Sequence, residues 1–198
     1  MEDRVAVFVD WDNLFFGARS LYGSPTIRID VAGLLNTLVG PRRLMRAYIY
    51  TAEVPAGDPR KAGQDAFLTA LRSIHYVEVR LGKLVRREAP GMHKLREELE
   101  HKGFLSQIDF DFRPIEIQKG VDVRMALDMV ELAHANAYSV AVLASGDGDL
   151  AQAAQRVRDQ GKWVELYHFG GGASHELLAA ADVRMRFEPG MIPLLKEA

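Results

Sequence analysis

Two aspartates flank a glycine in the motif Ser145-Gly146-Asp147-Gly148-Asp149, which directly follows the apolar run Val140–Ala144. A helical pattern begins near Leu150. A buried strand that turns into a helix at this motif places both carboxylates at the carboxyl edge of a sheet, where open α/β sheets bind their ligands. A single Asp in such a place is explained as a helix cap. Two aspartates around a glycine indicate a binding site.

The same layout occurs near the start of the chain. The apolar run Val5–Val9 ends in Asp10-Trp11-Asp12-Asn13, and a helical pattern covers residues 14–21. A further acidic residue, Asp122, lies at the start of a predicted helix that runs to about residue 134. Strand ends on one side of a parallel sheet converge, so we expect the acidic positions of these segments to share one cleft: Asp10, Asp12, Asp122, Asp147 and Asp149.

Carboxylates that converge raise one another's pKa unless a cation lies between them. Oxygen-rich clusters of this kind suit Mg²⁺ or Mn²⁺, which bind through a few carboxylates, waters and a substrate phosphate. A bound divalent ion can activate water and stabilise the charge on a phosphodiester. Carboxylates alone would repel a nucleic acid, and the ion removes that repulsion. The acidic set therefore predicts metal-assisted chemistry on a phosphate ester.

Strands that alternate with helices predict an α/β fold with a mainly parallel sheet. We expect strands at 5–9, 43–50, 77–81, 140–144, 163–169 and 183–187. We expect helices at 14–21, 30–39, 58–74, 122–134, 149–160 and 174–181. The third of these helices is expected to begin with Asp58 as its N-cap, because Pro59 follows at the first helical position. Gly161 fits a C-terminal cap.

The composition changes between about residues 83 and 114, which carry the basic residues Lys83, Arg86, Arg87, Lys94, Arg96 and Lys102 and the breaker Pro90-Gly91. We interpret this segment as a basic excursion from the sheet, with a polar helix at 92–102 and an irregular strand at 110–117. Three roles are open for this segment: a lid, a dimer contact and an RNA clamp. A homodimer is one of the expected states of assembly. The whole chain, 1–198, is expected to form a single domain with a short C-terminal tail at 189–198.

The chain has 198 residues, 48% apolar and 26% charged, as in an ordinary globular protein. Its net charge of −2 gives no global nucleic-acid signal, so a nucleic-acid partner requires a local basic patch. It contains no cysteine, which excludes disulfides, thiolate zinc sites and cysteine nucleophiles and suits a reducing cytosol. The N-terminus is too short and acidic for a signal peptide, and no apolar run approaches membrane-spanning length. We therefore expect a cytoplasmic protein without a membrane partner.

Three motifs in order resemble the NYN domain of the PIN-like nuclease superfamily, and most closely its LabA-like (DUF88) branch. They are Asp10-x-x-Asn13-Leu14, then Lys119-Gly-Val-Asp122 with Asp128 six residues on, then Ser145-Gly-Asp147-Gly-Asp149. The resemblance covers roughly residues 4–187 and is weakest over the basic excursion. It implies a three-layer PIN-like fold, with a central mainly parallel sheet flanked by helices. It also implies a metal-dependent ribonuclease site that uses Mg²⁺ or Mn²⁺.

The resemblance also implies roles for individual residues. The metal-facing carboxylates would be Asp10, Asp122 and Asp147, and Asp149 would complete the set or cap its helix. Asn13 would orient Asp10 or a water, and Ser145 would hydrogen-bond the loop or a phosphate. The sequence departs from the family pattern at Asp12, which adds or shifts a ligand, and at Leu150, which replaces an aromatic residue.

Several of these residues have alternative explanations. A helix N-cap would explain Asp122 nearly as well as a metal site does. Asp128 lies four residues after Arg124, so an exposed i,i+4 ion pair is the alternative to a supporting place beside the metal-facing carboxylates. Asp122 and Asp128 are about 120° apart on an ideal helix, so both cannot point at one ion.

Single-stranded RNA is the expected partner. We expect Trp11 to be the residue that stacks with a base, and Phe15 and Phe16 to lie in the core. Phosphate contacts are expected from Lys119 and from Arg86 and Arg87 in the basic excursion. Lys119 is otherwise an ordinary surface residue.

The sequence is compatible with three functions. The first is a metal-dependent endoribonuclease that cleaves single-stranded RNA. The second is a phosphatase, because Asp10-Trp11-Asp12 after an apolar strand resembles the nucleophile and acid of the haloacid dehalogenases; Leu14 stands where that motif has Thr or Val. The third is a non-catalytic regulator that binds RNA or protein on a PIN-like scaffold. The acidic set favours the first.

Overall fold

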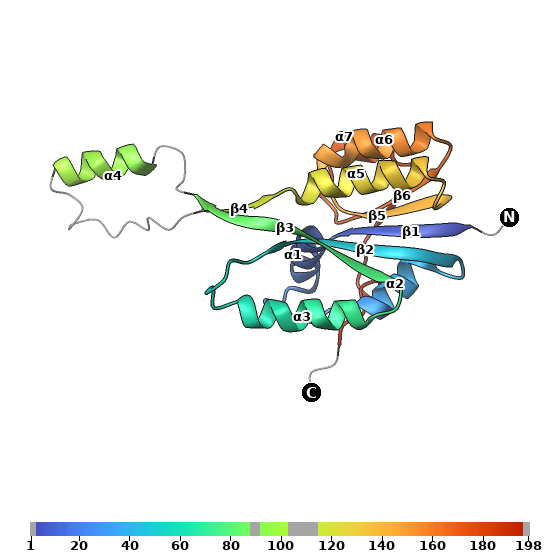
Figure 1. The fold of residues 1–198 in the computed structure, drawn as a ribbon, viewed down its shortest axis with the longest axis horizontal. Coiled ribbons are helices and arrows are strands. Elements are labelled where there is room, and N and C mark those ends of the chain that lie inside the picture. Colours follow the sequence, from blue (N-terminus) through green and yellow to red (C-terminus); the bar gives the residue numbers. More distant parts are fainter. Residues whose placement is uncertain (1–2, 88–91, 103–114, 196–198) are drawn as a thin grey trace.

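A seven-stranded sheet with the order β4-β3-β2-β1-β5-β6-β7 runs through the molecule (Figure 1). The computed structural model describes residues 3–87, 92–102 and 115–195. The strands are β1 Arg4–Asp10, β2 Arg43–Glu53, β3 Val77–Arg87, β4 Ile115–Lys119, β5 Val140–Ala144, β6 Trp163–His168 and β7 Val183–Arg186. Neighbouring strands are parallel, except that β4 is antiparallel to β3.

Strand β1 lies at the centre of the sheet, between β2 and β5. Its run Val5–Val9 is fully buried because both faces of the sheet are covered, which explains why every residue of the run is apolar. Val9 pairs with Ala144, so Asp10 at the end of β1 and Ser145 directly after β5 lie together at the carboxyl edge of the sheet. The strand order changes direction between β1 and β5, and such a point opens a crevice at the carboxyl edge.

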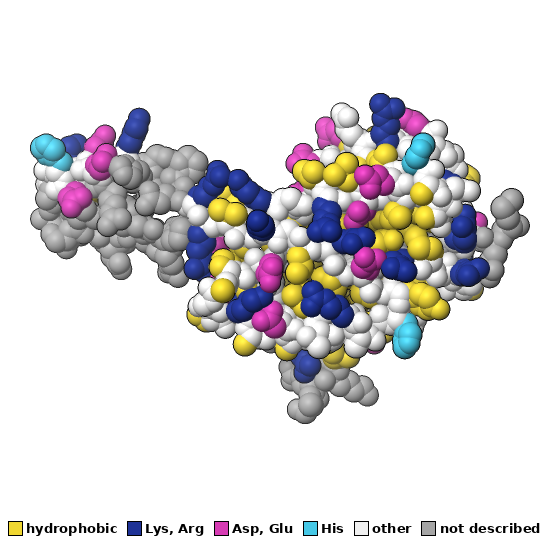
Figure 2. All heavy atoms as spheres, viewed as in Figure 1, with side chains coloured by type: hydrophobic (Ala, Val, Ile, Leu, Met, Phe, Trp, Pro, Cys, Tyr) yellow, Lys and Arg dark blue, Asp and Glu magenta, His cyan; other side chains and the backbone are white. Residues whose placement is uncertain are grey.

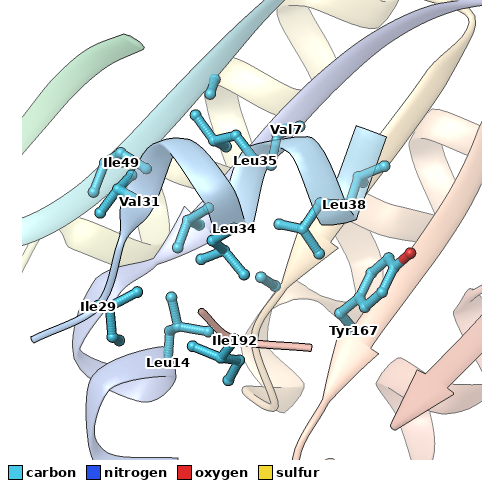
Figure 3. Close-up of a cluster of buried hydrophobic side chains, with 14 of the residues drawn as sticks. Val7, Leu14, Ile29, Val31, Leu34, Leu35, Leu38, Ile49, Tyr167 and Ile192 are labelled. Atoms are coloured by element: carbon cyan, nitrogen blue, oxygen red, sulfur yellow. The ribbon is translucent and has the colours of Figure 1, made fainter. Parts of the chain in front are cut away.

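Helices cover both faces of the sheet and form a three-layer α/β arrangement, as predicted (Figure 1). The helices are α1 Trp11–Tyr22, α2 Val31–Val39, α3 Lys61–Ser73, α4 Met92–His101, α5 Val121–His134, α6 Ala151–Asp159 and α7 His175–Ala180, with a single 3₁₀ turn η1 at Gly148–Leu150. One face packs against α1, α2 and α3, where Leu34 and Leu38 meet Val7 (Figure 3). The other packs against α5, α6 and α7.

Three predicted helix starts are wrong. Helix α1 begins at Trp11, because Asp10 caps it and the predicted acidic turn is its first turn. Helix α3 begins at Lys61 rather than Asp58, whose carboxylate accepts hydrogen bonds from Arg60 instead of capping the helix. The predicted helix 149–160 begins as η1 and becomes α-helical at Ala151.

The basic excursion leaves the sheet as an antiparallel ribbon of β3 and β4. Strand β3 extends to Arg87, beyond the predicted end at 81, and α4 occupies the predicted polar helix. The predicted strand at 110–117 is observed from Ile115; residues 110–114 lie outside the described residues. Lysine and arginine side chains gather where the ribbon leaves the body of the molecule (Figure 2). Lys83 pairs directly with Lys119 there, so two cations lie opposite each other.

The C-terminal tail is packed against the core as far as residue 195. Ile192 is fully buried, and its carbonyl accepts a hydrogen bond from the hydroxyl of Tyr22. The backbone N–H of Asp30 donates to the carbonyl of Pro193, and Leu194 forms a β-bridge with Ile29. In the part of the chain that the structure describes, no helix is long and apolar enough to cross a membrane.

Candidate active site

A cleft of about 510 Å³ opens at the carboxyl edge of the sheet, where the strand order changes direction. It combines four carboxylates with an amide-rich and aromatic wall. Its lining residues are Asp10, Asp12, Asn13, Phe16, Gly17, Gln118, Asp122, Asp147, Phe169 and Gly172. Residues predicted from three distant motifs therefore meet in one place, as the convergence of parallel strands requires.

Asp10 ends β1 and caps α1, and only 8% of its surface is exposed. One carboxylate oxygen, Oδ1, accepts the backbone N–H of Asn13 at 3.2 Å, and the other, Oδ2, accepts the hydroxyl of Ser145 at 3.2 Å. Burial raises the pKa of Asp10, the charges of Asp122 and Asp12 raise it further, and the two hydrogen bonds lower it. The result is a pKa of about 6, well above the usual 3.8.

Ser145 and Asn13 lock the start of α1 to the loop after β5. The hydroxyl of Ser145 donates to Asp10 and accepts the backbone N–H of Asp147 at 3.1 Å. The side-chain oxygen of Asn13 accepts the backbone N–H of Gly146 at 3.1 Å. Ser145 is buried, so this small hydrogen-bond network is shielded from water and holds the two acidic segments in a fixed relation.

Asp147 lines the cleft and Asp149 does not. Asp147 caps the 3₁₀ turn η1 by accepting the backbone N–H of Asp149 at 3.0 Å, so the prediction that Asp149 caps the helix is wrong. The side chain of Asp149 is exposed. Its negative charge nevertheless reaches Asp122, whose pKa it helps to raise.

Asp122 lies in the first turn of α5 and is not its cap. The N-cap is Gly120, whose φ of 79° is in the left-handed region that glycine tolerates. The explanation of Asp122 as an N-cap is therefore wrong, and Asp122 lines the cleft from the first turn of the helix. Burial raises the pKa of Asp122, followed by the charges of Asp147 and Asp149.

The neighbours of Asp12 include two residues that the sequence did not identify. Its Oδ2 accepts the amide of Gln118 at 2.6 Å and the hydroxyl of Thr51 at 3.1 Å. Gln118 lies on β4, which follows the basic excursion and pairs with β3, so this strand contributes directly to the cleft. No motif marks a lone Gln or Thr, and only the antiparallel return of β4 brings Gln118 to Asp12.

The carboxylates fit a hard divalent cation. Asp10 and Asp122 both have raised pKa values because burial and like charges disfavour their ionised forms, and a bound cation would relieve both effects. Among the described residues, no group of three or more His, Asp or Glu side chains lies close enough to hold one ion. The set therefore suits an ion that one or two carboxylates bind, with waters and a phosphate as its other ligands.

Asp128 lies away from the cleft and forms no pair with Arg124. Its Oδ2 accepts the hydroxyl of Tyr50 at 2.8 Å and lies 3.2 Å from Nε of Arg80. These contacts tie α5 to β2 and β3. Asp128 therefore holds the helix on the sheet, and the alternative explanation, an exposed i,i+4 ion pair with Arg124, is wrong; the supporting place beside the metal-facing carboxylates stays a prediction.

Two of the residues expected to bind RNA are occupied by other contacts. Arg86 forms ion pairs with Asp58 at 2.6 Å and Glu116 at 3.1 Å. The ring of Trp11 packs against Phe67, with centroids 4.6 Å apart, and lines a separate apolar hollow. Trp11 therefore does not face the acidic cleft. Arg87 and Lys119 are exposed.

Phe16 is 59% exposed and lines the cleft, so the prediction that it lies in the core is wrong. Leu14 and Ala18, four residues apart, are the buried face of α1. Phe16 is 200° around an ideal helix from Leu14 and points away from that face. Phe15 is partly buried, as expected of a residue at the edge of the core.

Gly146 allows the loop after β6 to close one side of the cleft. A Cβ at this position would lie 2.3 Å from the carbonyl oxygen of Gly172, which is a backbone atom that cannot turn away. We expect Gly146→Ala to lower the free energy of unfolding by about 2 kcal/mol or more. Gly63→Ala is the control, because its Cβ meets nothing and alanine favours the helix by up to about 1 kcal/mol. Urea unfolding of both variants measures the difference, and equal stability would contradict the close approach.

A family model described as the NYN domain matches residues 4–188. Among solved structures, the crystal structure of a protein of unknown function from Vibrio parahaemolyticus is similar, with a TM-score of 0.65 and 21% identity over 98% of this chain and 97% of that one. That likeness shows a shared fold. No curated protein matches. The LabA-like branch stays a prediction. The family match spans β1 to β7 and every residue of the cleft, so the chain belongs to the NYN domain family of the PIN-like nuclease superfamily.

Proposed function

We propose that this chain is a metal-dependent endoribonuclease that hydrolyses phosphodiester bonds of single-stranded RNA. The observation that carries the proposal is Asp10, a carboxylate buried at the end of the central strand in a cleft that it shares with Asp12, Asp122 and Asp147. A protein gains no stability from an ionised carboxylate that burial and like charges both disfavour. Such a residue is expected at a functional site, where the charge of a bound cation offsets the burial and the repulsion of the neighbouring carboxylates.

In this proposal the carboxylates of Asp10, Asp122 and Asp147 hold Mg²⁺ or Mn²⁺, one or two of them as direct ligands and the rest through bound water, and Asp149 adds negative charge at the rim. A divalent ion in this place supplies a Lewis acid for the phosphodiester and lowers the pKa of an attacking water. Ser145 and Asn13 hold the Asp10 carboxylate in one orientation. Preorganised groups of this kind need no rearrangement when charge develops on the phosphate.

Asp12 supports the nuclease rather than the phosphatase. A phosphatase of the haloacid dehalogenase type would use Asp10 as nucleophile and Asp12 as proton donor. Gln118 and Thr51 both donate to Oδ2 of Asp12 and hold its carboxylate against the wall of the cleft as a hydrogen-bond acceptor. A phosphatase would need this side chain to turn toward a leaving group as a proton donor. In the nuclease, Asp12 keeps its place and adds its charge to the acidic set, where it helps to raise the pKa of Asp10.

Cleavage of labelled single-stranded RNA in Mg²⁺, Mn²⁺ and EDTA tests the proposal. Asp147→Asn is expected to lower kcat by about a hundredfold or more, since each 1.4 kcal/mol of lost transition-state stabilisation costs about tenfold. Asparagine keeps the oxygen that accepts the N–H of Asp149, so the loop should stay folded. Asp65→Asn is the control, because Asp65 is exposed on α3 and pairs with Lys61. Intact RNA in every metal, with RNA still bound, would instead support the regulator.

A further inference from the structure

Phe16 joins the acidic cleft to a second hollow on the surface of α1. The second hollow has a volume of about 370 Å³ and is lined by Phe16, Arg19, Ser20, Gly23, Ser24 and Pro25. Phe16 lines both hollows, so the path over the surface from one hollow to the other crosses its ring. The exposed ring therefore lies directly beside the four carboxylates, on the way out of the cleft.

Arg19 lies one turn further along α1 and faces the same path. Its guanidinium carbon is 5.8 Å from the centre of the Phe15 ring and 5.9 Å from that of Phe16. Contacts of this kind with aromatic faces hold an arginine side chain in place. Arg19 forms no ion pair with any residue in the ranges 3–87, 92–102 and 115–195. Its charge is therefore available to a ligand.

We propose that Phe16 stacks with one unpaired base of the nucleic acid and that Arg19 contacts a phosphate of an adjacent nucleotide. The inference rests on the proposed nuclease function and names the feature that the site recognises. An isolated exposed phenylalanine is common on protein surfaces. Phe16, however, lies between the cleft, which suits a cation bound to a phosphate, and Arg19, which forms no ion pair within the described residues. A single nucleic-acid strand likewise alternates negatively charged phosphates with the apolar faces of its bases.

The same geometry explains a preference for single strands. Stacking on Phe16 requires a base whose face is open, and the bases of a duplex are covered by their neighbours. Trp11, another aromatic residue of this helix, cannot replace Phe16, because its ring is packed against Phe67. The lining of the cleft also includes the ring of Phe169, so it combines aromatic rings with carboxylates. A nucleotide bound there can place its base on an aromatic ring and its phosphate near the acidic set.

Binding of a short single-stranded oligoribonucleotide, measured by fluorescence anisotropy, tests the stack without depending on cleavage. All variants carry Asp147→Asn, so that the RNA stays intact. Phe16→Ala is expected to weaken binding about tenfold, within the range that loss of one base–aromatic stack produces. Phe16→Trp should preserve binding. Trp163→Ala is the control, because Trp163 is an equally exposed aromatic residue at the start of β6, at the opposite edge of the sheet.

Oligonucleotides with one abasic site at each position in turn identify the stacked nucleotide. At one position the abasic site should weaken binding as much as Phe16→Ala does, and the two changes together should cost no more than either alone. Arg19→Gln should reduce the slope of log K against log salt by about 0.7, as loss of one phosphate contact to a single strand does. Equal binding by Phe16→Ala, or an effect that persists on every abasic oligonucleotide, would overturn the stacking proposal.

The two proposals fail in different ways. If the wild-type protein cleaves no RNA but the abasic coupling to Phe16 is present, the nuclease function is wrong and the stacking contact is right. If the wild-type protein cleaves RNA and Phe16→Ala binds normally, the nuclease function is right and the stacking contact is wrong. Binding of duplex RNA that depends on Phe16 as strongly as binding of the single strand would also overturn the stack.

Discussion

Asp10→Asn is expected to abolish metal-dependent RNA cleavage while making the metal-free protein more stable. Cleavage should fall by about a thousandfold or more, because in the proposed function the substitution removes a ligand of an ion that would supply several kcal/mol to the transition state. The free energy of unfolding in EDTA at neutral pH should rise by up to about 3 kcal/mol. A single substitution would then separate the contribution of Asp10 to the rate of cleavage from its effect on the free energy of unfolding.

The sign follows from the pKa of Asp10, which folding raises from 3.8 to about 6. For an acid with a raised pKa, the folded state binds the proton more tightly than the unfolded state does. The stability that the group contributes is therefore complete below about pH 4 and is lost as the pH rises through 6. The shift of about two pH units corresponds to about 3 kcal/mol. Asparagine is never ionised, so it avoids this loss.

Asparagine also preserves the local structure. Its side-chain oxygen can accept the backbone N–H of Asn13, and Asn is as good an N-cap as Asp. Its amide can donate to the hydroxyl oxygen of Ser145, which then no longer donates to position 10. We therefore expect the variant to keep the fold of the loop after β5.

Urea unfolding in EDTA at pH 4, 5, 6, 7 and 8 measures the effect. The difference between Asp10→Asn and the wild type should be small at pH 4, grow through pH 5 and 6, and then stay constant. Asp159→Asn is the control, because Asp159 is half-exposed at the end of α6, where it accepts a hydrogen bond from Gln155. A variant that is less stable than the wild type at pH 7 would show that the hydrogen bonds to Asp10 outweigh its burial.

The acidic edge of this site was predictable from the sequence because its elements are dictated locally. The runs Val5–Val9 and Val140–Ala144 are wholly apolar, which occurs where both faces of a strand are covered. Parallel strands must then bring the residues that follow them to one edge. Asp10, Ser145 and Asp147 lie together for this reason alone, and no long-range contact had to be guessed.

The rest of the site depends on contacts that leave no local pattern. Gln118 reaches Asp12 only because β4 returns antiparallel to β3 with one particular register. Leu14, Phe15 and Phe16 are consecutive apolar residues, so they point to different sides of the helix. Hydrophobic periodicity therefore does not distinguish the exposed side of the helix from the buried one at this point. Asp58 precedes a proline as helix caps do, yet its side chain is 1% exposed and pairs with Arg60 and Arg86. Ile192 lies in the core without belonging to a helix or strand.

The affinity of the cleft for Mn²⁺ is expected to fall by at least about tenfold for each pH unit below 6. A carboxylate must lose its proton before it binds a cation, so protons compete with the metal wherever the pKa of the free site exceeds the pH. Asp10 has a pKa of about 6, and the pKa of Asp122 is also raised. An ordinary surface carboxylate would show no such competition above pH 5, because its pKa is near 4.

The steepness of this dependence reports how many carboxylates release a proton when the ion binds. The charge of Asp122 raises the pKa of Asp10, so the titrations of the two carboxylates are coupled. One released proton gives a tenfold change in affinity per pH unit, and two give up to a hundredfold. Well above pH 6 the part of this dependence that comes from Asp10 should disappear, since Asp10 is then ionised.

Free Mn²⁺ measured by electron paramagnetic resonance, in titrations between pH 5 and 8 at constant ionic strength, determines this dependence directly. Asp10→Asn should bind Mn²⁺ more weakly at pH 8 and should lose part of the slope, because one of the two competing protons is gone. Asp159→Asn should retain the wild-type curve. An affinity that is constant from pH 5 to 8 would place the ion away from Asp10, and the raised pKa of that residue would then belong to the fold and not to the reaction.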